Sequence, residues 1–263
     1  MATKKPEAKA DLPVPRPKME LGAVSPEWQR ELEAEAVSSA AQEPAQGKYL
    51  SLRGGVMSYQ GKAIPNSRMN FIILDGIMEH QLYTKPYDAN NPASPDCYAF
   101  GRTADSMKPA VQVEKPCSSN CPTCPKFAWG SDPKGGRGKA CREVRRIALI
   151  DAGVLDSGPE GILAAEIVMC KIPGMSVAPW SDYVRQLANV MKVPTWAVVT
   201  DFAVRPDPKS MLMCSFQFVK GITEEQGKAI AEKRRLMGDL LFTPYPPNAE
   251  GTPPQQPRKD ARY

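Results

Sequence analysis

Five of the seven cysteines in this chain fall within 45 consecutive residues, and this clustering restricts the fold more than any other feature of the sequence. The N-terminus is basic, and no apolar stretch of the kind found in a secretory signal follows it, so we expect a reducing cytoplasm. In that compartment clustered thiols favour a shared metal ion over disulfides. We therefore expect the fold to bring together sulfurs of the cluster, which comprises Cys97, Cys117, Cys121, Cys124 and Cys141.

The centre of the cluster is a CxxC knuckle, Cys121-Pro-Thr-Cys124, in which two thiolates on a tight turn can bind one ion. Cys97 and Cys141 each lie beside a strand-like run, so four thiolates converge if those strand ends adjoin the knuckle. Four cysteines without a nearby histidine predict a structural zinc site. An iron–sulfur cluster is the less favoured occupant, because the spacing is not that of ferredoxins. Cys117 is a spare that could replace Cys97, and spacing alone does not decide which four bind.

Catalytic motifs are weak in this sequence. The single histidine, His80, excludes an HExxH metalloprotease and is expected to be structural. A phosphate-binding GxxxxGK[ST] loop fails at Pro133 and Ala140. Asp96 and Asp132 belong to strings that resemble a PD…DxK nuclease pattern, but the second acid lies in a glycine-rich loop where two-carboxylate geometry would be hard to hold. We therefore expect no enzyme.

The chain divides into three regions. Residues 1–47 are expected to be a mobile arm with a short acidic helix that begins at Ser25, where a serine, a proline and a glutamate form a helix start. Residues 48–220 form the predicted core, with residues 97–146 as an inserted zinc-binding and basic segment. Residues 221–263 comprise a helix that Thr223 caps and a proline-rich tail, expected to be disordered, with six of the chain's 27 prolines in its last 21 residues.

The core has short, often alternating apolar runs rich in β-branched and aromatic residues, which are typical of strands. One helix, capped by Ser181, is expected among them and would place Tyr183, Leu187, Val190 and Met191 on one face. This pattern predicts a mainly β protein with a few helices: an OB-like β-barrel with an inserted four-cysteine zinc knuckle and flexible termini. The predicted strands are Tyr49–Arg53, Met69–Met78, Cys97–Gly101, Val144–Asp151, Ile162–Lys171, Trp196–Val204 and Leu212–Val219, with Cys170 and Cys214 packed in the core.

Positive charge is concentrated beside the knuckle. Residues 126–146 contain seven lysines and arginines against two acids, a net of +5 that equals the net charge of the whole chain. Cations bind phosphates and aromatic faces stack on bases, so this composition indicates a site for single-stranded nucleic acid. The alternative is a solvated loop in which Trp129 only packs against the knuckle. The candidate phosphate ligands are Lys126, Lys134, Arg137, Lys139, Arg142 and Arg145, and the candidate stacking residues are Tyr98, Phe100, Phe127 and Trp129.

Several segments together resemble a group of tailed-bacteriophage proteins related to single-stranded DNA-binding proteins. The resemblance covers about residues 48–220, and its most specific element is the string CxxCP…WGS…GKAC…RR around the knuckle. It implies an OB-fold protein that coats single-stranded DNA in phage replication or recombination, in the cytoplasm of a bacterial host. The C-terminus departs from proteins of this function, because residues 243–263 carry a net charge of +1 instead of an acidic tail.

These observations predict a phage-type protein that binds single-stranded DNA without sequence preference and without chemistry, with structural Zn²⁺. Possible further partners are phage replication or recombination proteins, and no membrane is expected because no run of apolar residues is long enough to span one. Two alternatives stay open. One is a metal-dependent or iron–sulfur nuclease acting on DNA, and the other is a protein-interaction module whose knuckle is purely architectural.

Overall fold

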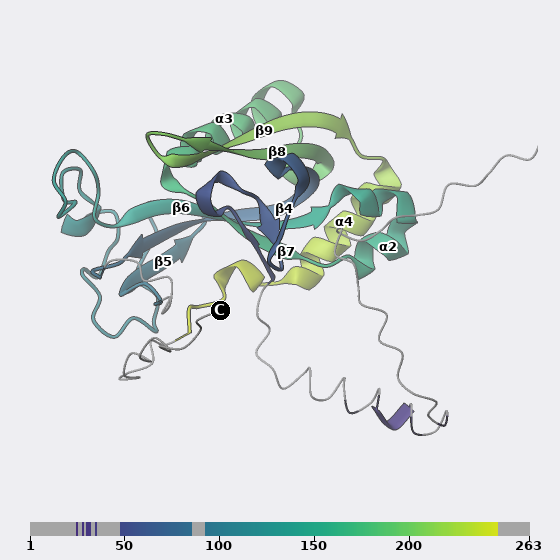
Figure 1. Ribbon diagram of the computed structural model, residues 1–263, viewed down its shortest axis with the longest axis horizontal. Coiled ribbons are helices and arrows are strands. Elements are labelled where there is room, and N and C mark those ends of the chain that lie inside the picture. The colour runs from purple at the N-terminus through teal and green to yellow at the C-terminus, as the bar shows by residue number, and fades with distance from the viewer. Residues whose placement is uncertain are drawn as a thin grey trace, which may run out of the picture. The chain divides into compact units, whose positions relative to one another are not determined.

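A computed structural model describes residues 48–85 and 93–246, together with a few positions of the N-terminal helix. The described chain divides into two compact units, of which the first comprises residues 1–77 and 144–241 and the second residues 78–143 and 242–263. The long strand β4 (Arg68–Leu82) begins in the first unit and ends in the second. Each unit is described separately below (Figure 1).

The first unit is built on a curled, mixed sheet that forms a half-barrel. The strands follow the order β3-β2-β1-β7-β6-β4-β8-β9, with β1 and β7 parallel and the other described pairs of this path antiparallel. No described pairing closes the path from β3 to β9. The strands other than β4 are β1 (Lys48–Ser51), β2 (Ser58–Tyr59), β3 (Lys62–Ala63), β6 (Arg142–Asp151), β7 (Val168–Ile172), β8 (Val198–Asp207) and β9 (Met211–Gly221).

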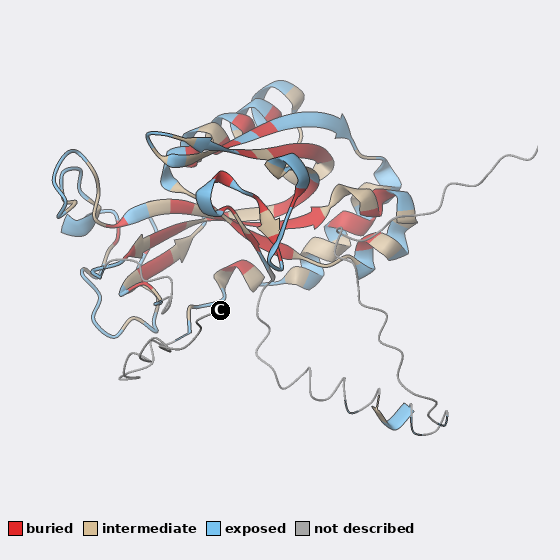
Figure 2. Cartoon of the chain, viewed as in Figure 1, coloured by how far each residue is buried: buried red, intermediate tan, exposed pale blue. Residues whose placement is uncertain are grey.

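The inner face of this sheet carries the apolar core. Phe202 of β8 is fully buried and stacks on Phe216 of β9, with ring centroids 4.9 Å apart. Trp180 and Tyr183 of helix α3 (Val177–Gln186) pack on the same Phe216 ring. Buried residues run along the central strands (Figure 2). On β4 and β6 both faces of the sheet are buried, because every residue of 71–74 and 147–150 is at most 1% exposed. Burial of this kind stabilises a fold by about 1.5 to 3 kcal/mol for each large apolar side chain.

Two helices differ from the sequence prediction. Helix α3 (Val177–Gln186) begins before Ser181 and continues as a π-helical turn, Leu187–Met191, so Val190 is 75% exposed and does not share the buried face of Tyr183 and Leu187. The predicted strand Ile162–Lys171 is wrong in its first half and correct in its second, which belongs to β7. Helix α2 (Gly158–Ala164) occupies its first residues, because Pro159 at the first turn and Glu160 favour a helix start.

The prediction of a capping box at Thr223 is confirmed. The Thr223 hydroxyl accepts from the Gln226 backbone N–H, and the Gln226 side chain accepts from the Thr223 backbone N–H at 2.9 Å. Helix α4 (Glu224–Met237) follows and ends before Gly238, a few residues earlier than predicted. It packs on α2, where the Lys233 ammonium donates to the Leu163 carbonyl at 2.5 Å.

The β8–β9 connection is a tight hairpin, as its prolines and polar residues predict. The Asp207 carboxylate accepts from the backbone N–H groups of Lys209 and Ser210 and from the Ser210 hydroxyl, and these bonds lower the pKa of Asp207. Opposite the hairpin, Gly55 has a φ of +76°, and a Cβ there would lie 2.6 Å from the Pro206 backbone nitrogen. Only glycine fits this close approach.

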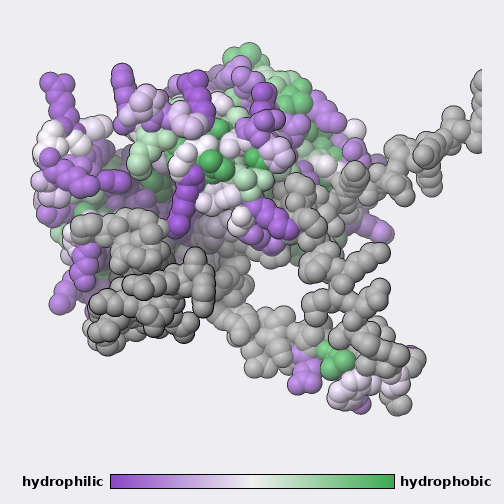
Figure 3. Space-filling model, in the orientation of Figure 1, coloured by the Kyte–Doolittle hydropathy of each residue, from purple (hydrophilic) through white to green (hydrophobic). Residues whose placement is uncertain are grey.

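The ends of the chain are described in part. The Trp28 backbone N–H donates to the Ser25 hydroxyl at 3.3 Å, as expected for a cap, and the described residues 28, 30–32 and 35 are helical. The rest of the predicted arm and residues 247–263 lie outside the described residues. None of the helices in the described ranges combines the length and hydropathy needed to span a bilayer. Hydrophilic side chains dominate the face shown in Figure 3, with small apolar areas where α3 and β9 lie.

Candidate metal centre and nucleic-acid interface

The second unit is organised by a two-stranded hairpin whose two faces have different chemistry. Residues 78–82 of β4 pair with β5 (Cys97–Gly101) in antiparallel register, with Leu82 opposite Cys97, His80 opposite Ala99 and Glu79 opposite Phe100. Successive side chains of a strand point to opposite faces. His80, Leu82, Cys97 and Ala99 therefore share one face, while Glu79, Tyr98 and Phe100 share the other.

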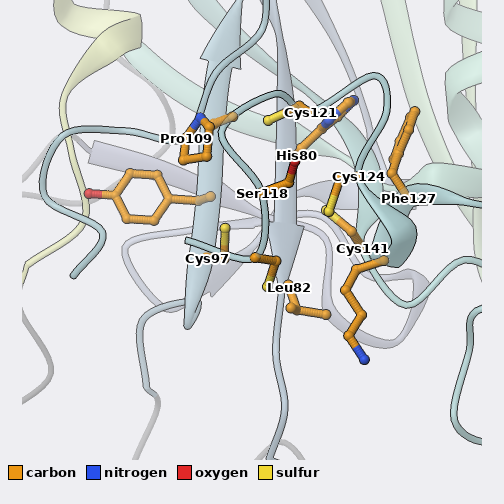
Figure 4. Close-up of a pocket in the computed structure, with 13 residues that line it drawn as sticks. His80, Leu82, Cys97, Pro109, Ser118, Cys121, Cys124, Phe127 and Cys141 are labelled. Atoms are coloured by element: carbon orange, nitrogen blue, oxygen red, sulfur yellow. The ribbon is translucent and has the colours of Figure 1, made fainter. Parts of the chain in front are cut away.

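The face that carries Cys97 lines a cavity to which all five clustered cysteines contribute. Backbone hydrogen bonds set the loops around it: the Cys121 N–H donates to the Met107 carbonyl at 3.1 Å, and the Cys124 N–H donates to the Cys121 carbonyl at 3.2 Å. The second of these bonds forms the tight turn that a CxxC knuckle requires. In Figure 4 the strand residues His80, Leu82 and Cys97 lie beside the loop residues Cys121 and Cys124. The cavity is lined by His80, Leu82, Cys97, Tyr98, Ala99, Pro109, Cys117, Ser118, Cys121, Cys124, Lys126, Phe127 and Cys141.

Burial and neighbouring thiols raise the pKa values of three cysteines in this cavity. Burial, and then the neighbouring Cys97 and Cys124, raise the pKa of Cys121 to about 11. Burial and the neighbouring thiols likewise raise the pKa of Cys141 to about 12, with Cys117 as the weakest of those neighbours. Cys117 itself is exposed, and its pKa is raised by burial and by Cys97 and Cys124 but lowered by Lys126. Cys121 and Cys141 are buried and Cys97 and Cys124 are half-buried, so Cys117 is the exposed member of the group.

The donor set suits a metal, although the side chains do not yet surround one. All seven cysteines have free thiols. As they stand, no three histidine, cysteine, aspartate or glutamate side chains in the described part of the chain are arranged to hold a metal ion. Four thiolates are the donors of a closed tetrahedral zinc site, so binding here requires the side chains to turn inward around the ion.

A basic loop, residues 126–141, projects from this cavity and is closed by its own hydrogen bonds. We call it the flap. The Cys141 N–H donates to the Lys126 carbonyl at 2.8 Å and closes the base of the loop. Farther out, the Gly138 carbonyl accepts from the backbone N–H groups of Gly130 and Asp132. The Asp132 carboxylate accepts from the Lys134 N–H at 2.9 Å, so this acid serves the turn. These bonds fix the backbone of the loop, while most of its residues are exposed.

On one side of the flap, aromatic rings stack and a lysine lies over them. The Phe127 ring stacks on the His80 imidazole with centroids 4.1 Å apart, and His80 is only 2% exposed. The Lys139 ammonium lies 3.6 Å from the Phe127 ring centroid and 4.8 Å from that of Trp129. Trp129 is 76% exposed, so most of its ring faces solvent. The predicted structural role of His80 agrees with this burial, and its position also makes it a wall of the thiol cavity.

The predicted phosphate ligands separate into two groups. Arg145 lies on β6 in the first unit. Its neighbour Arg146, counted in the charge of this stretch, is 1% exposed and donates to the Leu241 carbonyl at 3.2 Å, so it is a core cation with no surface to offer a phosphate. The remaining candidates belong to the second unit and are exposed or half-buried: Lys126, Lys134, Arg137, Lys139 and Arg142.

Two predicted stacking residues lie on the face opposite the thiols. We expected Tyr98 and Phe100 to accompany Phe127 and Trp129 because Cys97 precedes them. Tyr98 borders the thiol cavity, but strand alternation directs its side chain away from the face of Cys97. Tyr98 is 5% exposed, and its ring packs edge-on against Tyr245 at 4.9 Å. This burial leaves Tyr98 no free face for a base.

Tyr245 belongs to a short segment, Phe242 to Pro246, that we call the strap. Its hydroxyl hydrogen-bonds to the buried Glu79 carboxylate, and its ring also stacks on Phe100 with centroids 6.2 Å apart. The Pro246 carbonyl accepts from the Ser94 hydroxyl at 2.7 Å. The proline-rich tail was predicted to be disordered, but at the start of the tail Tyr245 packs on the hairpin, because two aromatic rings and one buried acid offer it partners.

Compared with models of known protein families, with curated proteins and with solved structures, the chain has no match. The interpretation of the site therefore depends on its own geometry.

Two features of this site were missed in the sequence. Pairing the two nearby strand-like runs, residues 78–82 and 97–101, as a hairpin would have placed His80 on the face of Cys97 and Tyr98 on the opposite face. The docking of Tyr245 had no comparable signal, because it joins the strap to a residue 166 positions earlier in the sequence.

Proposed function

We propose that this chain is a phage-type protein that binds single-stranded DNA without sequence preference and catalyses no reaction. The observation that carries this proposal is the flap: a hydrogen-bonded loop with an exposed tryptophan, Trp129, and four neighbouring cations on the same short segment. Single strands are bound by rings that stack on bases and by cations that release counterions from phosphates. The resemblance around the knuckle supports the assignment to phage replication or recombination.

In this proposal the metal is structural. Cys97, Cys121, Cys124 and Cys141 would hold Zn²⁺, because these four line the cavity with buried or half-buried thiols, whereas Cys117 is exposed. The ion would supply no chemistry beyond cross-linking β5, the knuckle and the base of the flap. Lys126, which lines the cavity, would offset the negative charge of four thiolates as well as serving a phosphate.

The fold that we propose for the first unit is an OB-like barrel. Its support is the curled sheet and the β8–β9 hairpin, together with α3 packed on the inner aromatic residues. The stacking residues of the proposed interface are Trp129 and, at its edge, Phe127. Phe100 contributes only if the strap is displaced, because Tyr245 stacks on it.

The test replaces Lys134 and Arg137 with alanine and measures affinity for a labelled single strand over a series of salt concentrations. Both side chains are exposed, and neither packs on the rings as Lys139 does. Each phosphate contact contributes about 0.7 to the slope of log affinity against log salt for a single strand. We expect the double variant to lower this slope by about 1.4, equally for unrelated sequences.

The control variant removes the same charge from the first unit, at Arg185 and Lys228, each of which forms an exposed ion pair on a helix. We expect it to leave the slope unchanged. Trp129→Ala separates stacking from charge: it should weaken binding by about 1 to 3 kcal/mol without changing the slope. An unaltered slope in the Lys134 and Arg137 variant would remove the flap from the interface, and absence of salt-dependent binding in the parent would refute the function.

A further inference from the structure

The cavity contains one more thiol than a tetrahedral metal site uses. Four thiolates complete the coordination of zinc, so the fifth sulfur has no place in the first shell. Among the five, Cys117 is the exposed one, whereas Cys97 and Cys124 are half-buried and Cys121 and Cys141 are buried. Cys117 is therefore the sulfur that a reagent in solution meets first.

Cys117 also has a thiol partner. Cys97 and Cys117 line the same cavity, and Cys97 is the neighbouring thiol that contributes most to the raised pKa of Cys117. Backbone bonds anchor the segment that carries Cys117 on either side: the Ala110 N–H donates to the Tyr98 carbonyl, and the Cys121 N–H donates to the Met107 carbonyl. The first bond joins this segment to β5 itself, next to Cys97, and the second joins its far end to the loop that follows β5.

We propose that Cys97 and Cys117 form an oxidisable dithiol at the mouth of the cavity, through which a low-molecular-weight disulfide releases the metal. This inference extends the proposed zinc site and rests on it for the release step. Lys126 lies close enough to Cys117 to influence its charge, and it gives the entrance a positive charge that attracts an anionic disulfide such as oxidised glutathione.

The chemistry proceeds by two thiol–disulfide exchanges. Cys117 attacks the small disulfide, forms a mixed disulfide with one half and releases the other half as a thiol, with the Cys117 proton. The Cys97 thiolate then leaves the metal and attacks the Cys117 sulfur, forming the Cys97–Cys117 bond and expelling the second half as a thiolate, which takes a proton from water. Two protein sulfurs are oxidised by two electrons, and the small disulfide is reduced to two thiols.

The consequence is a change in metal occupancy. Without Cys97, three thiolates remain, and the closed four-ligand shell of a structural zinc site is lost. The base of the flap is closed by Cys141, and the knuckle by Cys121 and Cys124, so release of the ion uncouples β5 from both. Nucleic-acid affinity should then fall together with the metal content.

The experiment treats the zinc-loaded full chain with oxidised glutathione and follows zinc release with a colorimetric chelator. The parent should release zinc, and peptide mapping of the product should give a Cys97–Cys117 disulfide. Cys117→Ser should keep the zinc content of the parent and release it at least about tenfold more slowly, because the attacking sulfur is absent. Ser119→Ala, a change at an exposed residue of the same loop that does not line the cavity, should behave like the parent.

Release by Cys117→Ser at the parental rate, or a disulfide that joins any other pair, would overturn the proposal. If the purified parent contains no zinc, the metal part of the proposed function fails. The dithiol is then tested by itself, by mapping the disulfide that forms when the metal-free chain is oxidised. A Cys97–Cys117 product would still support the dithiol in that chain, and a different pairing would refute it.

Discussion

The first unit buries twenty apolar residues of the described chain in one core around Phe202 and Phe216, whereas a core cluster of the second unit comprises Ala99, Met107 and Cys121. Close packing of large side chains holds the first unit together. The second unit instead has a thiol-lined cavity on one face of its hairpin and an aromatic strap on the other. The difference indicates that a short segment with little apolar area needs cross-links from another source.

The largest difference between the two units is expected when the metal is removed. A structural zinc site contributes an apparent free energy of about 10 to 16 kcal/mol to folding. After chelation we expect amide exchange in residues 97–141 to rise to unprotected rates, while the strands of the first unit keep their protection. Hydrogen-exchange mass spectrometry of the full chain measures both at once. Equal loss of protection in the two units would contradict the comparison, and so would no change in either.

Acid should act on the second unit in the same direction as chelation. The pKa values of Cys121 and Cys141 are raised to about 11 and about 12, so both thiols hold protons at neutral pH when no metal is bound. Zinc must displace these protons, and its apparent affinity therefore rises with pH and falls in acid. Each proton released steepens this dependence by about tenfold per pH unit. A competing chelator of known affinity measures the slope.

A smaller effect, confined to the first unit, is expected from Phe202→Ala. This ring is fully buried between Phe71 and Phe216, and removing such a ring costs about 3 to 5 kcal/mol through lost burial and the cavity left behind. Unfolding of the first unit, followed by denaturant titration, should shift by this amount. Zinc affinity should stay the same. A parallel loss of zinc affinity would show that the two units are not independently stabilised.

The smallest expected effect comes from the strap. Tyr245→Phe removes the hydroxyl that bonds to the buried Glu79 and should destabilise the second unit by about 1 to 3 kcal/mol, because a buried carboxylate loses a donor. Tyr183→Phe makes the same chemical change in the first unit, where the hydroxyl bonds to Thr200 at 2.6 Å. Amide exchange in each variant should rise only in the unit that carries the change. An effect of Tyr245→Phe on the first unit alone would show that the strap does not act through Glu79.

Local sequence patterns predicted elements whose reasons are themselves local. The capping box at Thr223 and the polar connection between β8 and β9 depend on residues within four positions of one another, and both are present. The predicted strand from Ile162 failed because its apolar residues also suit a short helix, and periodicity does not separate the two in so short a run. Val190 was misplaced because the end of α3 widens into a π-helical turn, which changes the helical spacing.

The sequence by itself determined that five thiols are close along the chain, that a CxxC turn lies at their centre and that positive charge and aromatic rings follow it. Only the tertiary structure decided which faces these side chains share. The register of β4 with β5 placed His80 and Cys97 on the cavity and turned Tyr98 and Glu79 toward the strap. Burial decided that Arg146 is a core cation. Register and burial arise from contacts between residues far apart in the chain, and for that reason spacing and composition do not contain them.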